Sequence, residues 1–412
     1  MRKQDIAIVG YGTAGQALAV LLSRDGHRVQ VFEQAQTPGP VGAGFLLQPS
    51  GLQVLWEMGL LAEVVAHGAP IQRLYGDTPC GRAVMDMRYA QLNTHLYGVG
   101  TQRGTLFSLL DAAWTQSRQL HVGQRIAEVD APSGRVQSTD GRWHGPFDLV
   151  VACDGSASAL RTQLQATRVD RIYPWGALWC LVPCGAWEHV SELRQRYVAA
   201  RKMIGLLPVG TRPGDGTPRL SFFWSLPRED FEPWQQRGME VWHEELARLW
   251  PQAVDQCAQI TDAGQLARAS YRDAVIGQWS RGRLVVAGDA AHAMSPQLGQ
   301  GVNMALLDAQ MLRDVLRLPI SNEQALALYQ QRRKAHVAIY QFWSRWLTPL
   351  FQSEHDRWAQ VRDVMLKPMA KMPLGAGHML RVLSGTQRGV LGTLALQPAF
   401  VSALAQARAA RT

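Results

Sequence analysis

The stretch IAIVGYGTAGQALAVLLSRDGHRVQVFEQ, residues 6–34, decides the fold. It begins with a short apolar run rich in β-branched residues, which is typical of a strand buried on both faces. Three glycines follow in the spacing G-x-G-x-x-G, at Gly10, Gly12 and Gly15, and then a helical pattern leads to a second apolar run that ends at Glu33. Strand, turn, helix and strand within about 30 residues predict a dinucleotide-binding unit.

Each position of this turn has a physical reason. Gly10 permits the tight turn, Gly12 lets the backbone approach a pyrophosphate, and Gly15 lets the helix pack closely against the strand. Thr13 and Ala14 open the helix, where unpaired N–H groups and the positive end of the helix dipole attract phosphates. The turn therefore predicts a bound dinucleotide.

The acid at the end of the second strand indicates where the sugar lies. Glu33 can accept hydrogen bonds from ribose hydroxyls, and Gln34 follows it at the same end of the strand. This pattern is shared by NAD and FAD sites, so the turn alone leaves both open.

The composition is that of a globular protein large enough for two or more domains. The chain has 412 residues, of which 47% are hydrophobic and 18% charged, with a formal net charge of +9. A basic surface attracts anions. The sequence has no dense run of Lys and Arg, so we do not expect nucleic acid as a partner. The five cysteines form no CxxC pair, and no signal peptide or run of about 18 apolar residues is visible. We expect a cytoplasmic protein without a metal site.

Two further motifs each follow an apolar strand. In DLVVACDGSASALR (148–161) the strand breaks at Asp154 and Gly155, and Arg161 lies at the start of an expected helix. In RLVVAGDAAHAMSPQLGQGVNMALLDAQML (283–312) the strand ends in an acid, and a glycine-containing loop leads into a long helix.

The three motifs together are similar to those of the class A flavoprotein aromatic monooxygenases, the p-hydroxybenzoate hydroxylase-like family. That family has a GxGxxG turn, a DG motif, and a GD motif that runs into P-x-x-G-Q-G-x-N. The matching residues of the last segment are Pro296, Gly299, Gln300, Gly301 and Asn303. The resemblance is good over residues 1–165 and 270–335 and thin elsewhere.

The resemblance implies tight, non-covalent FAD and transient NADPH or NADH. It assigns Asp289 to the ribitol hydroxyls and places Pro296 and Gly299 along the flavin ring, and it implies that Arg103 and Arg161 supply cations near the phosphates or the nicotinamide. A helix N-terminus beside the ring stabilises negative charge on reduced flavin. The expected cofactor-binding residues are Gly10, Gly12, Thr13, Ala14, Gly15, Glu33, Gln34, Arg103, Asp154, Gly155, Arg161, Gly288, Asp289, Pro296, Gly299, Gln300, Gly301, Val302 and Asn303.

The expected fold is α/β, with a Rossmann-type (GR2-like) FAD-binding domain that is discontinuous in sequence. We expect it over residues 1–70, 101–165 and 272–340, a β-sheet-rich substrate domain over 71–100 and 166–271, and a helical region over 341–412. Two alternatives are open for five aromatic residues, which either line a substrate pocket or form the core of the sheet: Trp175, Trp179, Phe222, Phe223 and Trp224.

The function that the resemblance implies is oxygen transfer from a C4a-hydroperoxyflavin to an aromatic or other electron-rich hydrophobic small molecule, by hydroxylation or epoxidation, with O2 and NAD(P)H consumed. No catalytic side chain is assigned, and His292 is expected to pack rather than react. Three alternatives remain: a halogenase, whose W-x-W-x-I-P signature is absent; an isoprenoid reductase; and a non-catalytic FAD-binding redox protein. The basic, aromatic tail resembles those of ubiquinone-pathway hydroxylases, and it either packs on the body or contacts a membrane.

Overall fold

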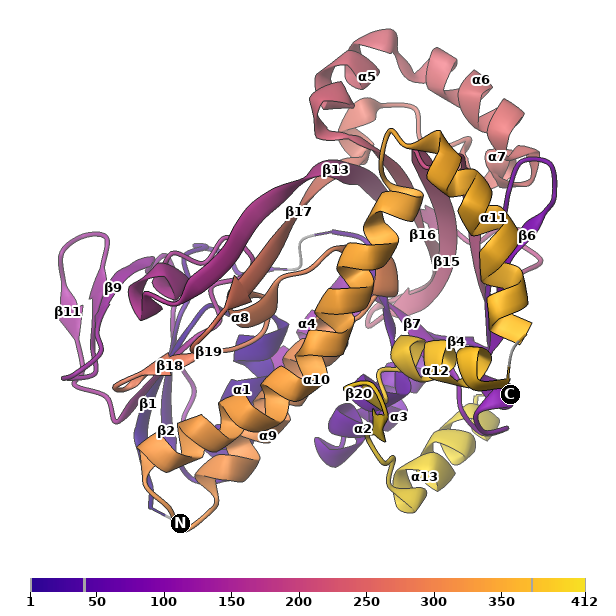
Figure 1. Ribbon diagram of the computed structural model, residues 1–412. Coiled ribbons are helices and arrows are strands. Elements are labelled where there is room, and N and C mark those ends of the chain that lie inside the picture. Colours follow the sequence, from indigo (N-terminus) through magenta and orange to yellow (C-terminus); the bar gives the residue numbers. More distant parts are fainter. Residues whose placement is uncertain (1, 40–41, 372, 412) are drawn as a thin grey trace.

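The opening stretch builds the first sheet of the computed structural model, which describes residues 2–39, 42–371 and 373–411 (Figure 1). Its strands lie in the order β18-β19-β12-β1-β2-β8, and all but β18 run parallel. Ile8 of β1 lies between Val31 and Val151, and all three are fully buried, as the apolar run predicts. The strands are β1 (Asp5–Val9), β2 (Arg28–Phe32), β8 (Gln119–His121), β12 (Leu149–Ala152), β18 (Ser280–Arg281) and β19 (Leu284–Val286).

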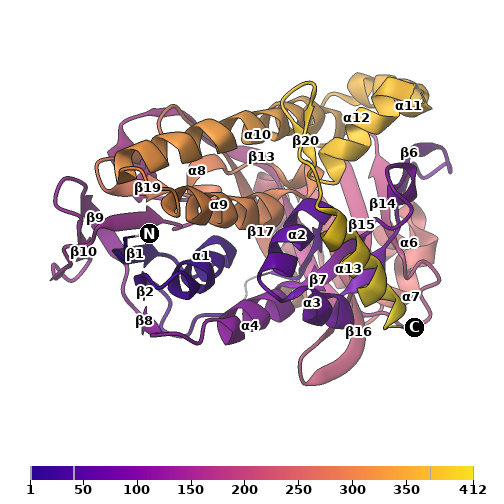
Figure 2. The same cartoon turned by 90° about the horizontal axis from the view of Figure 1, so that it is seen from below.

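Helices and a small meander flank this sheet. Helix α9 lies between α1 and α10, and it packs against both (Figure 2). A small meander forms a three-stranded antiparallel sheet at one end of the molecule. These elements are α1 (Thr13–Arg24), α8 (Asp289–His292), α9 (Gly301–Leu316), α10 (Asn322–Phe351), β9 (Ile126–Asp130), β10 (Arg135–Ser138) and β11 (Trp143–His144).

The second sheet has seven strands in the order β17-β13-β16-β15-β14-β5-β6. Strands from both segments of the expected substrate domain, 71–100 and 166–271, meet in this sheet, because β5 pairs in parallel with β14. Helices α5 to α7 cover one face at the end far from the first sheet (Figure 1). The elements are β5 (Arg73–Asp77), β6 (Ala83–Arg88), β13 (Thr167–Pro183), β14 (Glu192–Val198), β15 (Lys202–Arg212), β16 (Asp215–Pro227), β17 (Ala267–Ile276), α5 (Phe231–Arg237), α6 (Met239–Leu249) and α7 (Val254–Cys257).

The five aromatic residues divide between the two alternatives because side chains alternate along a strand. Phe222 and Trp224 are fully buried in the core beneath α6. Phe223 faces the other way and packs against Trp179, with ring centroids 5.0 Å apart, and both line a cavity. Trp175 is buried and donates its indole N–H to a backbone carbonyl.

Smaller elements join the two sheets. A three-stranded sheet in the order β3-β7-β4 lies beside α2, α3 and α4. The boundaries expected at residues 271 and 340 fall inside β17 and α10, so the domain limits stay a prediction. The joining elements are β3 (Gly44–Leu47), α2 (Pro49–Glu57), α3 (Leu61–His67), β4 (Ala69–Ile71), β7 (Gly98–Gln102) and α4 (Arg103–Ala113).

The C-terminal region packs on the body: α11 (Asp356–Lys371) lies against β6, and α13 (Pro398–Ala409) against α3. Helix α12 (Pro373–Leu383) and the hairpin β20 (Gln387–Arg388)–β21 (Gly392–Thr393) lie between them in the chain.

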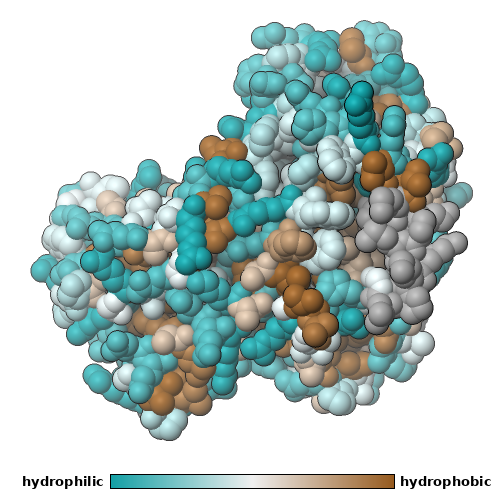
Figure 3. Space-filling model, in the orientation of Figure 1, coloured by the Kyte–Doolittle hydropathy of each residue, from teal (hydrophilic) through white to brown (hydrophobic). Residues whose placement is uncertain are grey.

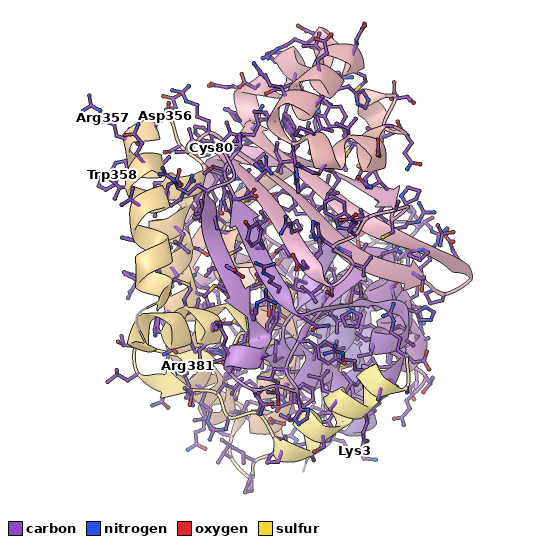
Figure 4. All side chains as sticks on the ribbon, turned by 90° about the vertical axis from the view of Figure 1, so that its right-hand side faces the viewer. Lys3, Cys80, Asp356, Arg357, Trp358 and Arg381 are labelled. Atoms are coloured by element: carbon purple, nitrogen blue, oxygen red, sulfur yellow. The ribbon has the colours of Figure 1, made fainter. Side chains whose placement is uncertain are left out.

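Apolar side chains also gather on the outer face of this region (Figure 3). Phe342 is 56% exposed and Trp358 is 55% exposed, and Trp358 points away from the body beside Arg357 (Figure 4). None of the helices that the structure describes has the length and hydropathy to cross a bilayer. Contact of this face with a membrane and a cytoplasmic location both stay predictions.

A buried carboxylate, Asp308 of α9, joins four elements. Its Oδ2 accepts hydrogen bonds from the Gly288 N–H (2.7 Å) and from His292 Nε2 (2.6 Å), while Oδ1 accepts from Arg333 Nε (2.6 Å). Burial opposes ionisation of Asp308, but His292 and Arg333 hold its pKa well below the usual range. The expectation that His292 packs is confirmed, because 1% of it is exposed.

His336 extends this network and makes it sensitive to acid. Its Nδ1 lies 2.6 Å from Arg333 Nη1. Burial, and then the Arg333 charge, lower the pKa of His336 from 6.5 to about 3. Between these values the unfolded chain binds a proton that the fold excludes, so stability should fall as the pH drops below 6.5.

Replacing His336 with glutamine should flatten this acid dependence. A single such group contributes a slope of up to about 1.4 kcal/mol per pH unit. The measurement is the urea midpoint of wild type and His336→Gln between pH 4 and pH 8, with exposed His95→Gln as the matched control. Parallel curves for wild type and His336→Gln would show that His336 does not carry the effect.

Candidate active site

A cavity of about 830 Å³ lies between the two sheets. Its walls include the β1–α1 turn and the residues that follow β12 and β19, so the carboxyl ends of three parallel strands open into it. Strands of the seven-stranded sheet, with α10 and α12, form the rest of the wall. This is the edge at which open α/β sheets bind ligands.

The three glycines of the first turn have different roles. A Cβ on Gly10 (φ +100°) would lie 2.4 Å from the Cys153 carbonyl oxygen, and one on Gly15 would lie 2.0 Å from the Gly10 oxygen. A Cβ on Gly12 would meet no atom within 4 Å, and Gly12 lines the cavity with Thr13 and Ala14. The fold therefore requires glycine at 10 and 15, whereas position 12 leaves open space for a ligand.

Glu33 stabilises the turn through hydrogen bonds to the backbone. Its two carboxylate oxygens accept hydrogen bonds from the N–H groups of Tyr11 and Ala35, both at 2.8 Å. Each oxygen keeps a second lone pair for a ribose hydroxyl. Gln34 is exposed beside it, and the assignment of both to the ribose stays a prediction.

The DG motif also lies at the cavity edge. Gly155 (φ +81°) lines the cavity, and Asp154 Oδ2 accepts from the Leu160 N–H at 3.3 Å. Asp154 Oδ1 is buried and has no hydrogen-bond partner in the part of the chain that the structure describes. A buried orphan oxygen at this position is a group that a ligand hydroxyl can satisfy.

Arg161 departs from its expected role. It is fully buried, and the helix expected to begin near it is a short 3₁₀ turn, Leu160–Leu164. Its guanidinium donates to the backbone oxygens of Asp289 (3.2 Å), Ala290 (3.1 Å) and Ser156 (2.7 Å). Arg161 lies outside the cavity wall, so the structure shows it fixing the backbone that carries Asp289 rather than facing a phosphate or a nicotinamide.

Asp289 and Arg103 bring opposite charges to the same cavity. Asp289 begins α8 and is exposed to the cavity, and Arg103 begins α4 with its guanidinium 5.5 Å from the Phe45 ring centre. Within residues 2–39, 42–371 and 373–411, neither side chain has a hydrogen bond or an ion pair. Burial lowers the pKa of Arg103, and the nearby Asp289 carboxylate opposes that shift.

The loop before α9 is held in place by two amides. Asn303 Nδ2 donates to the Leu46 and Gly299 oxygens, both at 3.2 Å, and Gln300 Nε2 donates to the Leu383 oxygen at 2.7 Å. Asn303 is buried outside the cavity wall, so it anchors the loop. Gly288 also lies outside the cavity wall, and its N–H bond to the Asp308 carboxylate fixes the backbone that follows β19.

The cavity wall includes the residues at the N-terminal end of α9. The lining residues of this loop include the expected Pro296, Gly299, Gln300, Gly301 and Val302. The first-turn N–H groups of a helix have no partner within the helix, so they are available to an anion.

A comparison with protein-family models matches residues 3–341 to the FAD binding domain. The chain belongs to this FAD-binding family. It is 28% identical over 383 residues to 2-heptyl-3-hydroxy-4(1H)-quinolone synthase of Pseudomonas aeruginosa, covering 89% of this chain and 94% of that protein. It is 25% identical over 393 residues to 6-hydroxynicotinate 3-monooxygenase of Bordetella bronchiseptica, covering 90% and 98%.

Solved structures agree with this membership. The crystal structure of pqsL, a probable FAD-dependent monooxygenase from Pseudomonas aeruginosa, superposes with a TM-score of 0.75 at 26% identity and covers 88% of this chain and 100% of that one. The expected α/β architecture, an FAD-binding sheet joined to a β-rich second sheet, is confirmed.

The residues present fit FAD. Gly12, Asp289 and Arg103 line one cavity, and neither charge is paired among the described residues. The orphan oxygen of Asp154 lies between the lining residues Cys153 and Gly155 in the chain. FAD has an anionic diphosphate, which suits the free N–H groups at the helix N-termini. Its ribose and ribityl hydroxyls suit carboxylates, and its flat ring suits the open space at Gly299. The individual contacts stay predictions.

Sequence reasoning missed two polar side chains in the cavity, Tyr271 of β17 and His378 of α12. The Tyr271 hydroxyl accepts from Trp179 Nε1 at 2.9 Å, and burial raises the pKa of Tyr271 well above its usual value. His378 Nε2 accepts from Trp343 Nε1 at 3.3 Å, and burial lowers the pKa of His378. No motif marks either position, and only the fold brings them to the cavity.

Gly12→Val should fold but lose FAD, because its side chain enters the cavity without meeting the protein. Gly15→Val should fail to fold stably, because its Cβ would lie 2.0 Å from a backbone oxygen. The measurements are the flavin-to-protein ratio and the circular dichroism spectrum of each variant. A Gly12→Val protein with one FAD per chain would contradict the assignment of the turn.

Asp289→Ala should weaken FAD binding by roughly one to two decades, since a charge-assisted hydrogen bond is worth about 1.5–3 kcal/mol. Asp289→Asn, which keeps the size and removes the charge, separates the two contributions. Affinity is measured by fluorescence as FAD is titrated into the apoprotein. An unchanged dissociation constant for both variants would remove Asp289 from the FAD contacts.

Proposed function

We propose that this FAD-dependent monooxygenase uses NADPH or NADH and O2 to hydroxylate an aromatic small molecule. The observation that carries the proposal is that the residues fitted to FAD and an apolar, aromatic-walled compartment belong to the same cavity. The relatives support it, because their names are those of monooxygenases and of a synthase that makes a hydroxylated quinolone.

The compartment suits a reaction that must exclude water. Trp179, Phe223 and Leu207 of the second sheet line the cavity together with Leu347 and Phe351 of α10. When bound, FAD supplies hydride acceptance and oxygen activation, while the protein orients the substrate and shields the reaction. None of these walls carries a group that must itself react.

The N-terminal end of α9 would favour negative charge on reduced flavin. Gly301 and Val302 lie at the cavity wall at the positive end of a 16-residue helix. The preceding Gly299 has φ +61°, and a Cβ there would meet no atom within 4 Å, so Asn and Asp can both be placed at this position.

Gly299→Asp should lower the flavin midpoint potential by several tens of millivolts relative to Gly299→Asn. Repulsion between like charges at close range is on the order of 2 kcal/mol, and about 30 mV corresponds to 1.4 kcal/mol for a two-electron couple. The measurement is a spectroelectrochemical titration of both variants. Equal shifts in the two would show a steric effect and refute the electrostatic role of this loop.

Oxygen transfer itself is tested with ¹⁸O2. The names of the relatives supply two first substrates, a 4-quinolone with a heptyl chain and 6-hydroxynicotinate. A substrate should stimulate NAD(P)H oxidation, and its product should contain one atom of ¹⁸O. A halogenated product would favour the halogenase, and a reduced product formed without O2 would favour the reductase. NAD(P)H oxidation that no compound stimulates would favour the redox protein.

A further inference from the structure

The cavity is lined by few cations, and only one of them is free of an ion pair among the described residues. Among the described lining residues, the positively charged ones are Arg103, Arg268 and Arg272. Arg268 is paired with Glu232, and Arg272 is paired with Asp170. The remaining guanidinium, Arg103, lies beside the carboxylate at the cofactor end.

Part of the cavity wall is apolar and adaptable. Four methionines line it, on β6, β15 and α12: Met85, Met87, Met203 and Met379. Methionine is unbranched and flexible, so such a wall can follow the shape of a flexible apolar chain. A carboxylate placed here would lose its hydration without a cation to replace it.

The polar groups of this compartment are neutral, and most are already paired. Gln195 Oε1 accepts the Tyr197 hydroxyl at 2.9 Å, and Gln195 Nε2 lies 3.6 Å from the Met203 sulfur. The imidazole of His378 accepts from Trp343. Without a free cation, such groups replace the lost hydration of an uncharged ligand more completely than that of an anion.

Tyr271 is the directed donor. Its hydroxyl oxygen accepts the Trp179 indole N–H, and Trp179 packs against Phe223. The Arg103 charge is near enough to act on Tyr271. Its own hydrogen has no acceptor among the residues that the structure describes, and the side chain lines the cavity. A ligand oxygen can complete this chain of hydrogen bonds.

We propose that the substrate is an uncharged ring that carries a hydrogen-bond-accepting oxygen and a flexible apolar chain, with the oxygen bound by Tyr271 and the chain against the methionine wall. This inference rests on the proposed function and names its substrate class. It separates this chain from a hydroxylase of ring carboxylates, which needs a free cation to bind the acid.

The test titrates the FAD-loaded protein with four probes and no NAD(P)H, using the absorbance change of the bound flavin. The probes are a 4-quinolone ring carrying a methyl, a propyl or a heptyl group, and the same ring carrying a carboxylate. Affinity should rise roughly fourfold for each buried methylene. The carboxylate probe should bind at least tenfold more weakly than the methyl probe.

Tyr271→Phe should weaken the heptyl probe roughly three- to tenfold, the net value of one hydrogen bond. It should change the affinity for a heptyl quinoline without the ring oxygen by much less. Tyr75→Phe is the matched control, since Tyr75 lies outside the cavity and stacks beneath Arg73 and Arg194. It should leave both affinities unchanged.

Three results would overturn the inference: equal binding of the carboxylate probe, no dependence on chain length, or equal effects of Tyr271→Phe and Tyr75→Phe. The proposed function fails separately. Probes that bind as expected but take up no ¹⁸O during turnover would contradict oxygen transfer and leave the binding inference standing. Hydroxylation of the carboxylate probe alone would support oxygen transfer and overturn the substrate class.

Discussion

The Asp308 carboxylate holds the end of β19, helix α8 and helix α10 at one buried point, behind the part of the cavity wall that carries Asp289. Its bond to the Gly288 N–H fixes the residue immediately before Asp289. Arg161 holds the Asp289 carbonyl from the other side. Removing one partner of a buried charge network costs several kcal/mol, so the position of the Asp289 side chain is strongly determined by groups that never meet the ligand.

The glycines and amides show the same division between framework and ligand surface. Gly10 and Gly15 are required because backbone meets backbone, and Asn303 is committed to the Leu46 and Gly299 carbonyls. Gly12 and Gly299 face open space. A motif therefore mixes residues that build the site with residues that bind, and only the geometry separates them.

Much of this site follows from local pattern, and some of it cannot. Strand, glycine turn, helix and acid lie within one short segment, so the first unit and its ligand class are readable from sequence. Arg333 and Asp308 meet across 25 residues, and Tyr271 meets Trp179 across 92 residues, with no spacing rule that links them. Arg161 carries a charge expected near a phosphate, but its burial among carbonyls depends on how the α8 backbone returns to it.

Side chains alternate along a strand, which explains why the aromatic residues of the second sheet divide between the core and the cavity. This alternation alone does not say which face of the sheet the helices cover. That depends on α6, which packs over Trp224 and leaves Phe223 to the cavity. The same limit applies to α10, a continuous helix that passes from the FAD-binding sheet to the substrate compartment. The domain boundary that we expect at residue 340 falls inside α10, because the resemblance to the family fades there while the helix continues.

The central claim is that one cavity holds both FAD and substrate, and a crystal structure of the FAD-loaded protein tests it most directly. We predict that the diphosphate lies against Gly12 and Ala14 and that the ribityl chain lies within reach of Asp289. The flavin ring should lie between the loop at Gly299 and the compartment that contains Tyr271. FAD bound outside this cavity, or a ring that fills the methionine-lined end and leaves no space for a substrate, would contradict it.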